Sequence, residues 1–267
     1  MSMRSSVLVS LLAWAVFLVF GSVSAPFFLS PADSLAAPSP QIAPVPNHIN
    51  LDARAILEQA HIAIEKVEWL AARVRQKKRQ GESRWTSEAT RQRGPEGCCR
   101  LELIIHTGTT NANRLTVISD GKVLARVTRT DDAKPKVESW PLPDDSAARN
   151  VVLANNGCGG PATVFAQMRA RGADWTAQPA VVDDKPGVAV TGLLSSVVTD
   201  SALGIEPKSA RLFLDAETLW LTRAEWWSDH PERGGTLLYE IEFLQPRVNQ
   251  PLSLEECDRV FSYRPET

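Results

Sequence analysis

The chain has 267 residues, of which 43% are hydrophobic and 22% are charged, and its formal net charge is −2. This near balance of charge argues against a nucleic-acid-binding protein, which needs a strongly basic surface. Beyond the N-terminal segments, about 220 residues are left, enough for one sizeable domain whose core needs no disulfide bonds for stability.

Residues 1–25 have the layout of a secretory signal peptide: Arg4, an apolar run over 7–20, and small residues up to Ala25. The run is shorter than the roughly 20 apolar residues that span a membrane. Ala25 is the natural cleavage position, but Pro26 disfavours a cut there, so two alternatives stay open. These are cleavage after Ser24 and an uncleaved N-terminal anchor that touches the membrane. Together with cleavage after Ala25, they all place the protein in the periplasm or cell envelope.

Residues 26–49 contain six prolines among Ser and Ala, a composition that does not form a packed core and is typical of a linker. We expect residues 50–267 to form a single domain. Its first element is a helix over 51–75 with Asn50 as N-cap. The apolar residues of this helix alternate at three- and four-residue spacing and must pack on a sheet; they are Leu57, Ala60, Ile64, Val67, Ala71 and Val74.

The basic residues Lys77, Lys78 and Arg79 then lie at the C-terminal end of that helix. They either complement the helix dipole on a solvated surface or contact an anionic membrane.

Strand-like runs follow over 84–93 and 100–107, and two more flank Asp120 and Gly121 within 115–129. Asp-Gly is typical of a hairpin with a type I′ turn, because both central residues of that turn need positive φ. A short strand is expected over 137–142, then a loop over 151–160, and then a helix that begins at Pro161 and ends at Gly172.

The last ninety residues alternate strand-like runs with turns, which favours an antiparallel sheet. The expected strands cover 187–199, 211–214, 219–227, 236–244 and 260–263, with turns at 215–217 and 230–235. Trp226 and Trp227 are neighbours on one strand, so they point to opposite faces and only one of them faces the core.

The four cysteines are Cys98, Cys99, Cys158 and Cys257. Cys98 and Cys99 are adjacent, so at most one of them easily faces a partner. Cys158 can pair with Cys257, or one of these two can pair with Cys98 or Cys99, and the sequence leaves these pairings open. Cys158 also lies in a glycine-rich stretch before a helix, where a cysteine can act as a nucleophile. That hydrolase hypothesis needs His106 as a base and is the least favoured function.

No other catalytic or metal-binding pattern emerges. The histidines His48, His61, His106 and His230 lack metal-ligand spacing. Each pair of adjacent acids lies in a polar loop or turn, where the carboxylates do not face each other across a substrate; the pairs are Asp131-Asp132, Asp144-Asp145, Asp183-Asp184 and Glu255-Glu256. The sequence therefore predicts a protein that is not an enzyme, with no metal and no cofactor.

Residues 118–125, ISDGKVLA, resemble the central hairpin of the LolA-like family of periplasmic lipoprotein carriers, with its turn at Ser119, Asp120, Gly121 and Lys122. Other segments are similar in the same order: the helix over 51–75, the helix over 160–172, the stretch 173–175, the strands over 212–244 and the terminal 261–265. The resemblance implies an α+β fold, in which a curved antiparallel half-barrel sheet carries an N-terminal helix and a short loop helix. Its concave face is an apolar cavity under helices.

The resemblance also implies function: an exported, monomeric carrier that holds the acyl chain of a lipoprotein or another lipid, without chemistry. Arg93 and Arg100 lie near the place of the family's arginine that holds the lid shut. The same fold serves as a sensor, so an envelope sensor or protein-interaction module is the alternative. The side chains expected to line the cavity are Leu103, Ile105, Val117, Leu124, Leu212, Leu214, Trp220 and Phe243; a one-residue register shift would turn them to the other face.

Overall fold

The computed structural model describes residues 52–80, 83–106, 112–130, 134–195 and 206–263. The expected signal peptide, linker and domain start at residue 50 lie outside them. Among the described residues no helix is long and apolar enough to cross a membrane.

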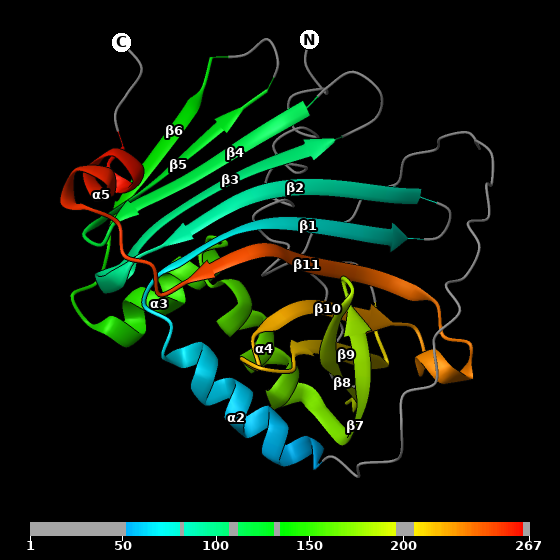
Figure 1. Cartoon of the computed structure of the whole chain (residues 1–267). Coiled ribbons are helices and arrows are strands. Elements are labelled where there is room, and N and C mark those ends of the chain that lie inside the picture. The colour runs from blue at the N-terminus through cyan, green and yellow to red at the C-terminus, as the bar shows by residue number, and fades with distance from the viewer. Residues whose placement is uncertain (1–51, 81–82, 107–111, 131–133, 196–205, 264–267) are drawn as a thin grey trace.

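The described strands form one eleven-stranded antiparallel sheet in the order β6-β5-β4-β3-β2-β1-β11-β10-β9-β8-β7 (Figure 1). Its first six strands are β1 (Leu70–Gln80), β2 (Ser83–Arg93), β3 (Cys98–His106), β4 (Ala112–Asp120), β5 (Val123–Arg129) and β6 (Lys136–Pro141). The others are β7 (Gly172–Val182), β8 (Lys185–Leu194), β9 (Ser209–Asp215), β10 (Leu221–Trp227) and β11 (Leu237–Val248).

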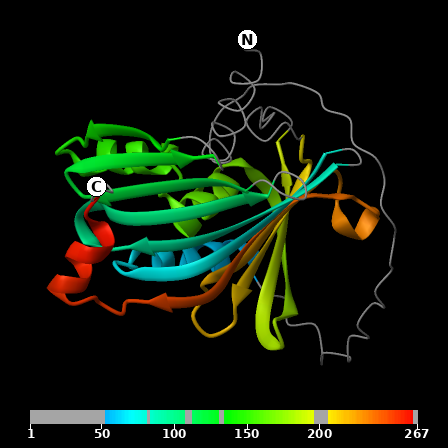
Figure 2. The same cartoon turned by 90° about the horizontal axis from the view of Figure 1, so that it is seen from above.

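The described helices are α2 (Ala53–Glu65), α3 (Ser146–Asn155), α4 (Gly160–Arg171) and α5 (Leu254–Phe261). The face of the sheet on which α2, α3 and α4 pack is called the inner face, and the opposite one the outer face. Figures 1 and 2 show the sheet curved over these helices, with α5 apart from them at one end. The predicted fold class, α+β with a curved antiparallel sheet, an N-terminal helix and a loop helix, is confirmed.

The first helix differs from its prediction at both ends. Asp52, not Asn50, is the N-cap, and its carboxylate accepts hydrogen bonds from the N–H groups of Arg54 (3.0 Å) and Ala55 (3.2 Å). The helix ends at Glu65, and residues 70–80 form β1 instead. In this stretch Leu70, Ala72 and Val74 also fit the two-residue period of a strand, and pairing with β2 and β11 on both sides decides in its favour.

The basic run therefore lies on a strand, and the helix-dipole interpretation is wrong. Lys77 Nζ lies 2.6 Å from the Glu240 carboxylate across the β1–β11 pair. Lys78 is buried, with its ammonium 4.9 Å from the centre of the Trp85 ring.

Two further expectations are wrong because helix caps were overlooked. Half of the expected loop over 151–160 belongs to α3, whose N-cap Asp145 accepts a 2.7 Å hydrogen bond from the Ala148 N–H. The first two residues of the expected strand over 260–263 are the end of α5, which begins with a capping box formed by Ser253 and Glu256, and the other two are not in a strand. Strand β7 was not predicted as a strand.

The hairpin of β4 and β5 is confirmed, but its turn is not type I′. Gly121 has φ +89°, whereas Asp120 does not have positive φ. The Asp120 carboxylate instead accepts 2.8 Å hydrogen bonds from the N–H groups of Lys122 and Val123, and the Ser119 hydroxyl accepts one of 3.0 Å from the Gly121 N–H.

The two adjacent tryptophans of β10 point to opposite faces, as predicted. Trp226 packs in the core of the inner face, where its ring centre lies 5.0 Å from that of Tyr239. Trp227 lies on the outer face and donates a 3.0 Å hydrogen bond from Nε1 to Glu225.

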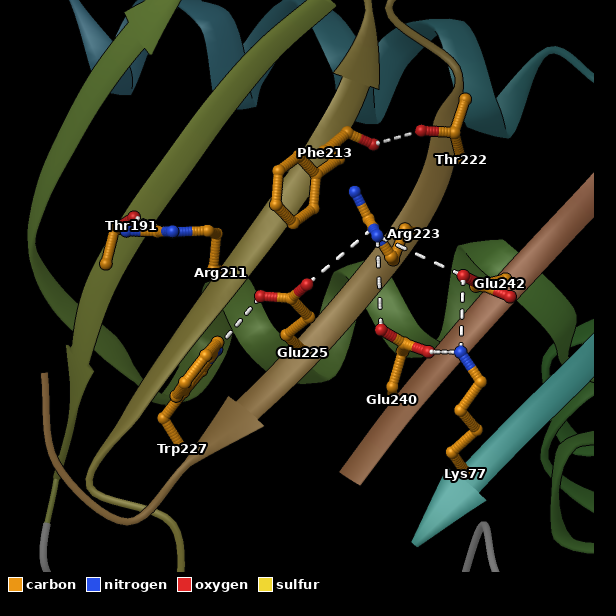
Figure 3. A network of polar contacts seen from close by, with 10 residues as sticks. All are labelled: Lys77, Thr191, Arg211, Phe213, Thr222, Arg223, Glu225, Trp227, Glu240 and Glu242. Atoms are coloured by element: carbon orange, nitrogen blue, oxygen red, sulfur yellow. Dashed lines mark hydrogen bonds and ion pairs between the residues drawn. The ribbon is translucent and has the colours of Figure 1, made fainter. Parts of the chain in front are cut away.

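Charged side chains of β1, β11 and β10 alternate across the outer face (Figure 3). Lys77 lies between Glu240 (2.6 Å) and Glu242 (3.8 Å), and Arg223 lies 3.7 Å from Glu225 and 4.0 Å from both other carboxylates. Burial raises the pKa of Glu225 above its usual value, although Arg223 and the Trp227 N–H oppose this rise. The network thus joins three neighbouring strands by side chains as well as by backbone hydrogen bonds.

We expect Gly121→Ala to lower the free energy of unfolding by about 2–4 kcal/mol, through left-handed strain and a steric clash. A Cβ at Gly121 would lie 2.5 Å from the Glu96 carbonyl oxygen. Gly234 has φ +81° with no atom within 4 Å of its Cβ position, so Gly234→Ala isolates the strain and costs only about 1 kcal/mol. Urea denaturation measures the free energy of unfolding of both variants. Equal losses of stability would show that the contact with the Glu96 carbonyl adds no cost.

Candidate functional site

All eight side chains predicted to line a cavity lie together at the inner face. Seven of them are buried in a single apolar core, and Ile105 packs against it half-buried. The strand pairings bring them there: Leu101 faces Val117, Leu103 faces Leu115, and Leu212 faces Val190. Helices α2 and α4 cover this core with Leu57, Ile64, Phe165 and Met168. Contact of these residues with a ligand stays a prediction.

In the part of the chain that the structure describes, a pocket lies at the edge of the inner face and is here called the mouth. β11 pairs with β1 as far as Val248, but its pairing with β10 ends at Glu242. Beyond that point a pocket of about 810 Å³ lies between β11, the turn from β9 to β10 and the end of α2. Its volume falls in the range of about 300–1,000 Å³ that is usual for small-molecule sites.

The mouth combines apolar walls with a charged rim. Two of the predicted residues, Trp220 and Phe243, line it together with Ala63, Val67 and Val248. The rim carries cations and carboxylates from three strands and two turns: Arg73, Arg75, Lys185, Asp183, Asp215 and Glu217. The mouth therefore offers apolar contact inside and polar contact at the edge.

Asp215 shapes the turn that forms one side of the mouth. Its carboxylate accepts 2.8 Å hydrogen bonds from the N–H and hydroxyl groups of Thr218 and one of 3.1 Å from the Glu217 N–H. Burial by itself would raise the pKa of Asp215, but these hydrogen bonds and nearby Lys185 hold it below its usual value. The turn is thus stabilised by a carboxylate that stays ionised at neutral pH.

A buried arginine joins the sheet to the helices. Arg91 on β2 points to the inner face, and its Nη1 donates a 2.9 Å hydrogen bond to the Gly157 carbonyl in the α3–α4 loop. Burial, with a smaller contribution from the charge of Arg93, lowers the pKa of Arg91 to about 9. The side chain is still charged at neutral pH, and a Cβ at Gly160 would lie 2.7 Å from its Nε, so the loop closes tightly around it.

The sequence did not single out Arg91 as the arginine that joins the sheet to the helices. Arg93 points to the same face two residues further on, and burial lowers its pKa too. Arg100 points to the outer face, where it contacts Glu102 and the Val260 carbonyl. The period of β2 could have singled out Arg91, because Ala89 and Arg91 share a face.

A disulfide between Cys99 and Cys158 holds the same loop to β3, with the two Cα atoms 6.4 Å apart. This is one of the pairings that the sequence left open. It makes the hydrolase hypothesis wrong, because a disulfide sulfur has no thiolate to attack a substrate. His106, the expected base, lies seven residues along β3 from Cys99, about 23 Å away at the strand's rise per residue.

Several of the remaining polar candidates shape helix ends and turns, whereas His48, Asp131 and Asp132 lie outside the described residues. Asp145 and Glu256 cap helices, and Asp183 and Asp184 have positive φ in the turn between β7 and β8. His61 stacks on Phe165 with the ring centres 6.3 Å apart. No cluster of His, Cys, Asp or Glu suited to a metal ion occurs among the described residues.

No protein-family model matches the chain, and no curated protein matches its sequence. Solved structures match it at low identity. The lipoprotein LppX of Mycobacterium tuberculosis is 11% identical, with 76% of this chain and 97% of that chain covered and a TM-score of 0.44. LprF of Mycobacterium bovis is 14% identical, with coverage of 76% and 95% and a TM-score of 0.45.

The MucA/MucB complex of Pseudomonas aeruginosa also matches, at 14% identity and a TM-score of 0.41. The match covers 78% of this chain and 60% of the other, so this chain spans about three fifths of the length of that relative. These likenesses concern the fold alone.

We expect Arg91→Met to loosen the α3–α4 loop. The variant loses a hydrogen bond from a charged donor, worth about 1.5–3 kcal/mol, so backbone amides of residues 156–160 should exchange with deuterium roughly tenfold faster. Arg93→Met is the control, because it removes a neighbouring guanidinium and leaves the bond to Gly157 in place. Equal exchange in the loop of both variants would show that Arg91 does not hold it.

Proposed function

We propose that this chain is an exported, monomeric lipid-binding protein that holds an acyl chain against the inner face and performs no chemistry on it. The observation that carries this proposal is the continuity of the apolar core of the inner face with the mouth. Trp220 and Phe243 belong to both.

The hydrophobic effect supplies enough free energy for such binding. Each methylene removed from water contributes about 0.8 kcal/mol. Ten methylenes therefore contribute roughly 8 kcal/mol before the cost of immobilising the ligand, which alone would correspond to a dissociation constant near 1 μM. A site of this kind recognises apolar area and shape, so a lipoprotein acyl chain and a free fatty acid are both within its range.

The contacts of the helix layer favour entry through the mouth. The α3–α4 loop is fixed to β2 by Arg91 and to β3 by the disulfide. The mouth lies on β11, three strands from β3 and hence about 14 Å across the sheet. The α3–α4 loop is thus fixed on the side of the inner face that lies away from the mouth.

The disulfide also supports the exported location that residues 1–25 predict. Disulfide bonds persist in oxidising compartments such as the periplasm and are rare in the cytosol.

The test fills the mouth with a bulky side chain. Ala63 lines the mouth half-buried, whereas Ala55 lies exposed on the same helix away from it. We expect Ala63→Trp to weaken uptake of a fluorescent fatty acid at least tenfold, because the indole occupies the space that the acyl chain enters. Ala55→Trp is the matched control and should bind the probe as the unaltered chain does.

Fluorescence titration at equal protein concentration measures the affinities. Equal binding by both variants would place the site elsewhere. The absence of binding by the unaltered chain would favour the alternative, a protein-interaction module on the same fold.

A further inference from the structure

The C-terminal helix α5 lies on the outer face, where β3 begins and β4 ends (Figure 2). Arg100 Nη1 donates a 3.1 Å hydrogen bond to the Val260 carbonyl of this helix. Phe261 is buried beside Gly94, where an added Cβ would lie 3.3 Å from the Phe261 ring. The helix is therefore docked on the sheet by its last turn.

Two free thiols, Cys98 and Cys257, lie on the facing surfaces of this contact. Neighbouring residues of a strand point to opposite faces, so Cys98 points outward, beside Arg100, because its neighbour Cys99 points inward to Cys158. On α5, Cys257 comes four residues before Phe261, so both side chains lie on the same side of the helix.

The surroundings of Gly94 show how close the two surfaces come. A Cβ at Gly94 would lie 3.3 Å from the Phe261 ring and 3.4 Å from the Cys98 Cβ, so both side chains flank the same small residue. Burial raises the pKa of the Cys98 thiol, as do the charges of Asp120 and of the Cys257 thiolate, which places the second sulfur within electrostatic range of the first.

We propose that Cys98 and Cys257 form a second disulfide, which pins α5 to the sheet in the oxidised protein. The reaction needs an external disulfide, such as oxidised glutathione or the disulfide of a thiol oxidase. One thiol loses its proton and attacks that disulfide, and the second thiolate then attacks the mixed disulfide. One S–S bond forms in the protein and one breaks in the oxidant, which takes up two electrons and leaves as two thiols.

Peptide mapping under non-reducing conditions tests this pairing. Trypsin places Cys98 and Cys99 together in peptide 94–100, Cys158 in 150–169 and Cys257 in 248–259. After refolding with oxidised and reduced glutathione and blocking with N-ethylmaleimide, all three peptides should be linked in one species. A species that links only the first two, with blocked Cys257, would overturn the proposal.

The double variant Cys99→Ser/Cys158→Ser removes the first disulfide. It should still link peptide 94–100 to 248–259, which assigns the bond to Cys98. Cys257→Ser should lower the melting temperature of the oxidised protein by about 5–10 °C, because the bond would close a loop of some 160 residues. The same substitution should leave the melting temperature of the reduced protein unchanged. An equal shift of the melting temperature in the oxidised and reduced proteins would contradict the proposal.

Discussion

The shape of this protein depends on one difference in strand pairing. β11 is bonded to β1 as far as Val248, but to β10 only as far as Glu242. Past Glu242 one edge of β11 is turned away from β10, and the turn stabilised by Asp215 lies across the gap from Phe243. The sheet therefore stays continuous through β11 and still leaves the pocket at the mouth.

The opposite side of the same face is closed by two different interactions. The disulfide from Cys99 fixes the α3–α4 loop covalently, and the Arg91 guanidinium bonds to the carbonyl one residue before the bridged Cys158. A buried cation is costly unless it is well bonded, so Arg91 keeps the loop closed at some expense of stability. An apolar ligand that entered at the mouth would enter on the side of the inner face opposite this fixed loop.

The eight apolar side chains do share the inner face, but the sequence could not fix which way they face, because Leu103, Val117 and Leu212 each have an apolar neighbour. Prediction failed where two periods coincide: Leu70 and Val74 fit both a helix and a strand, and only pairing with two neighbouring strands decides. Arg91 was missed because the inner side of β2 is mostly polar, so only the face that it shares with Ala89 could have revealed it. The disulfide partner of Cys158 depends on the fold, so the spacing of the cysteines in the sequence could not predict it.

Native mass spectrometry tests the central claim most directly. The chain would be purified without detergent from a host with membranes, and the same sample would be measured again after incubation with excess fatty acid. The account predicts a one-to-one complex with an acyl-containing species in at least the second measurement, and release of that species on unfolding. The bare polypeptide mass in both measurements would contradict it.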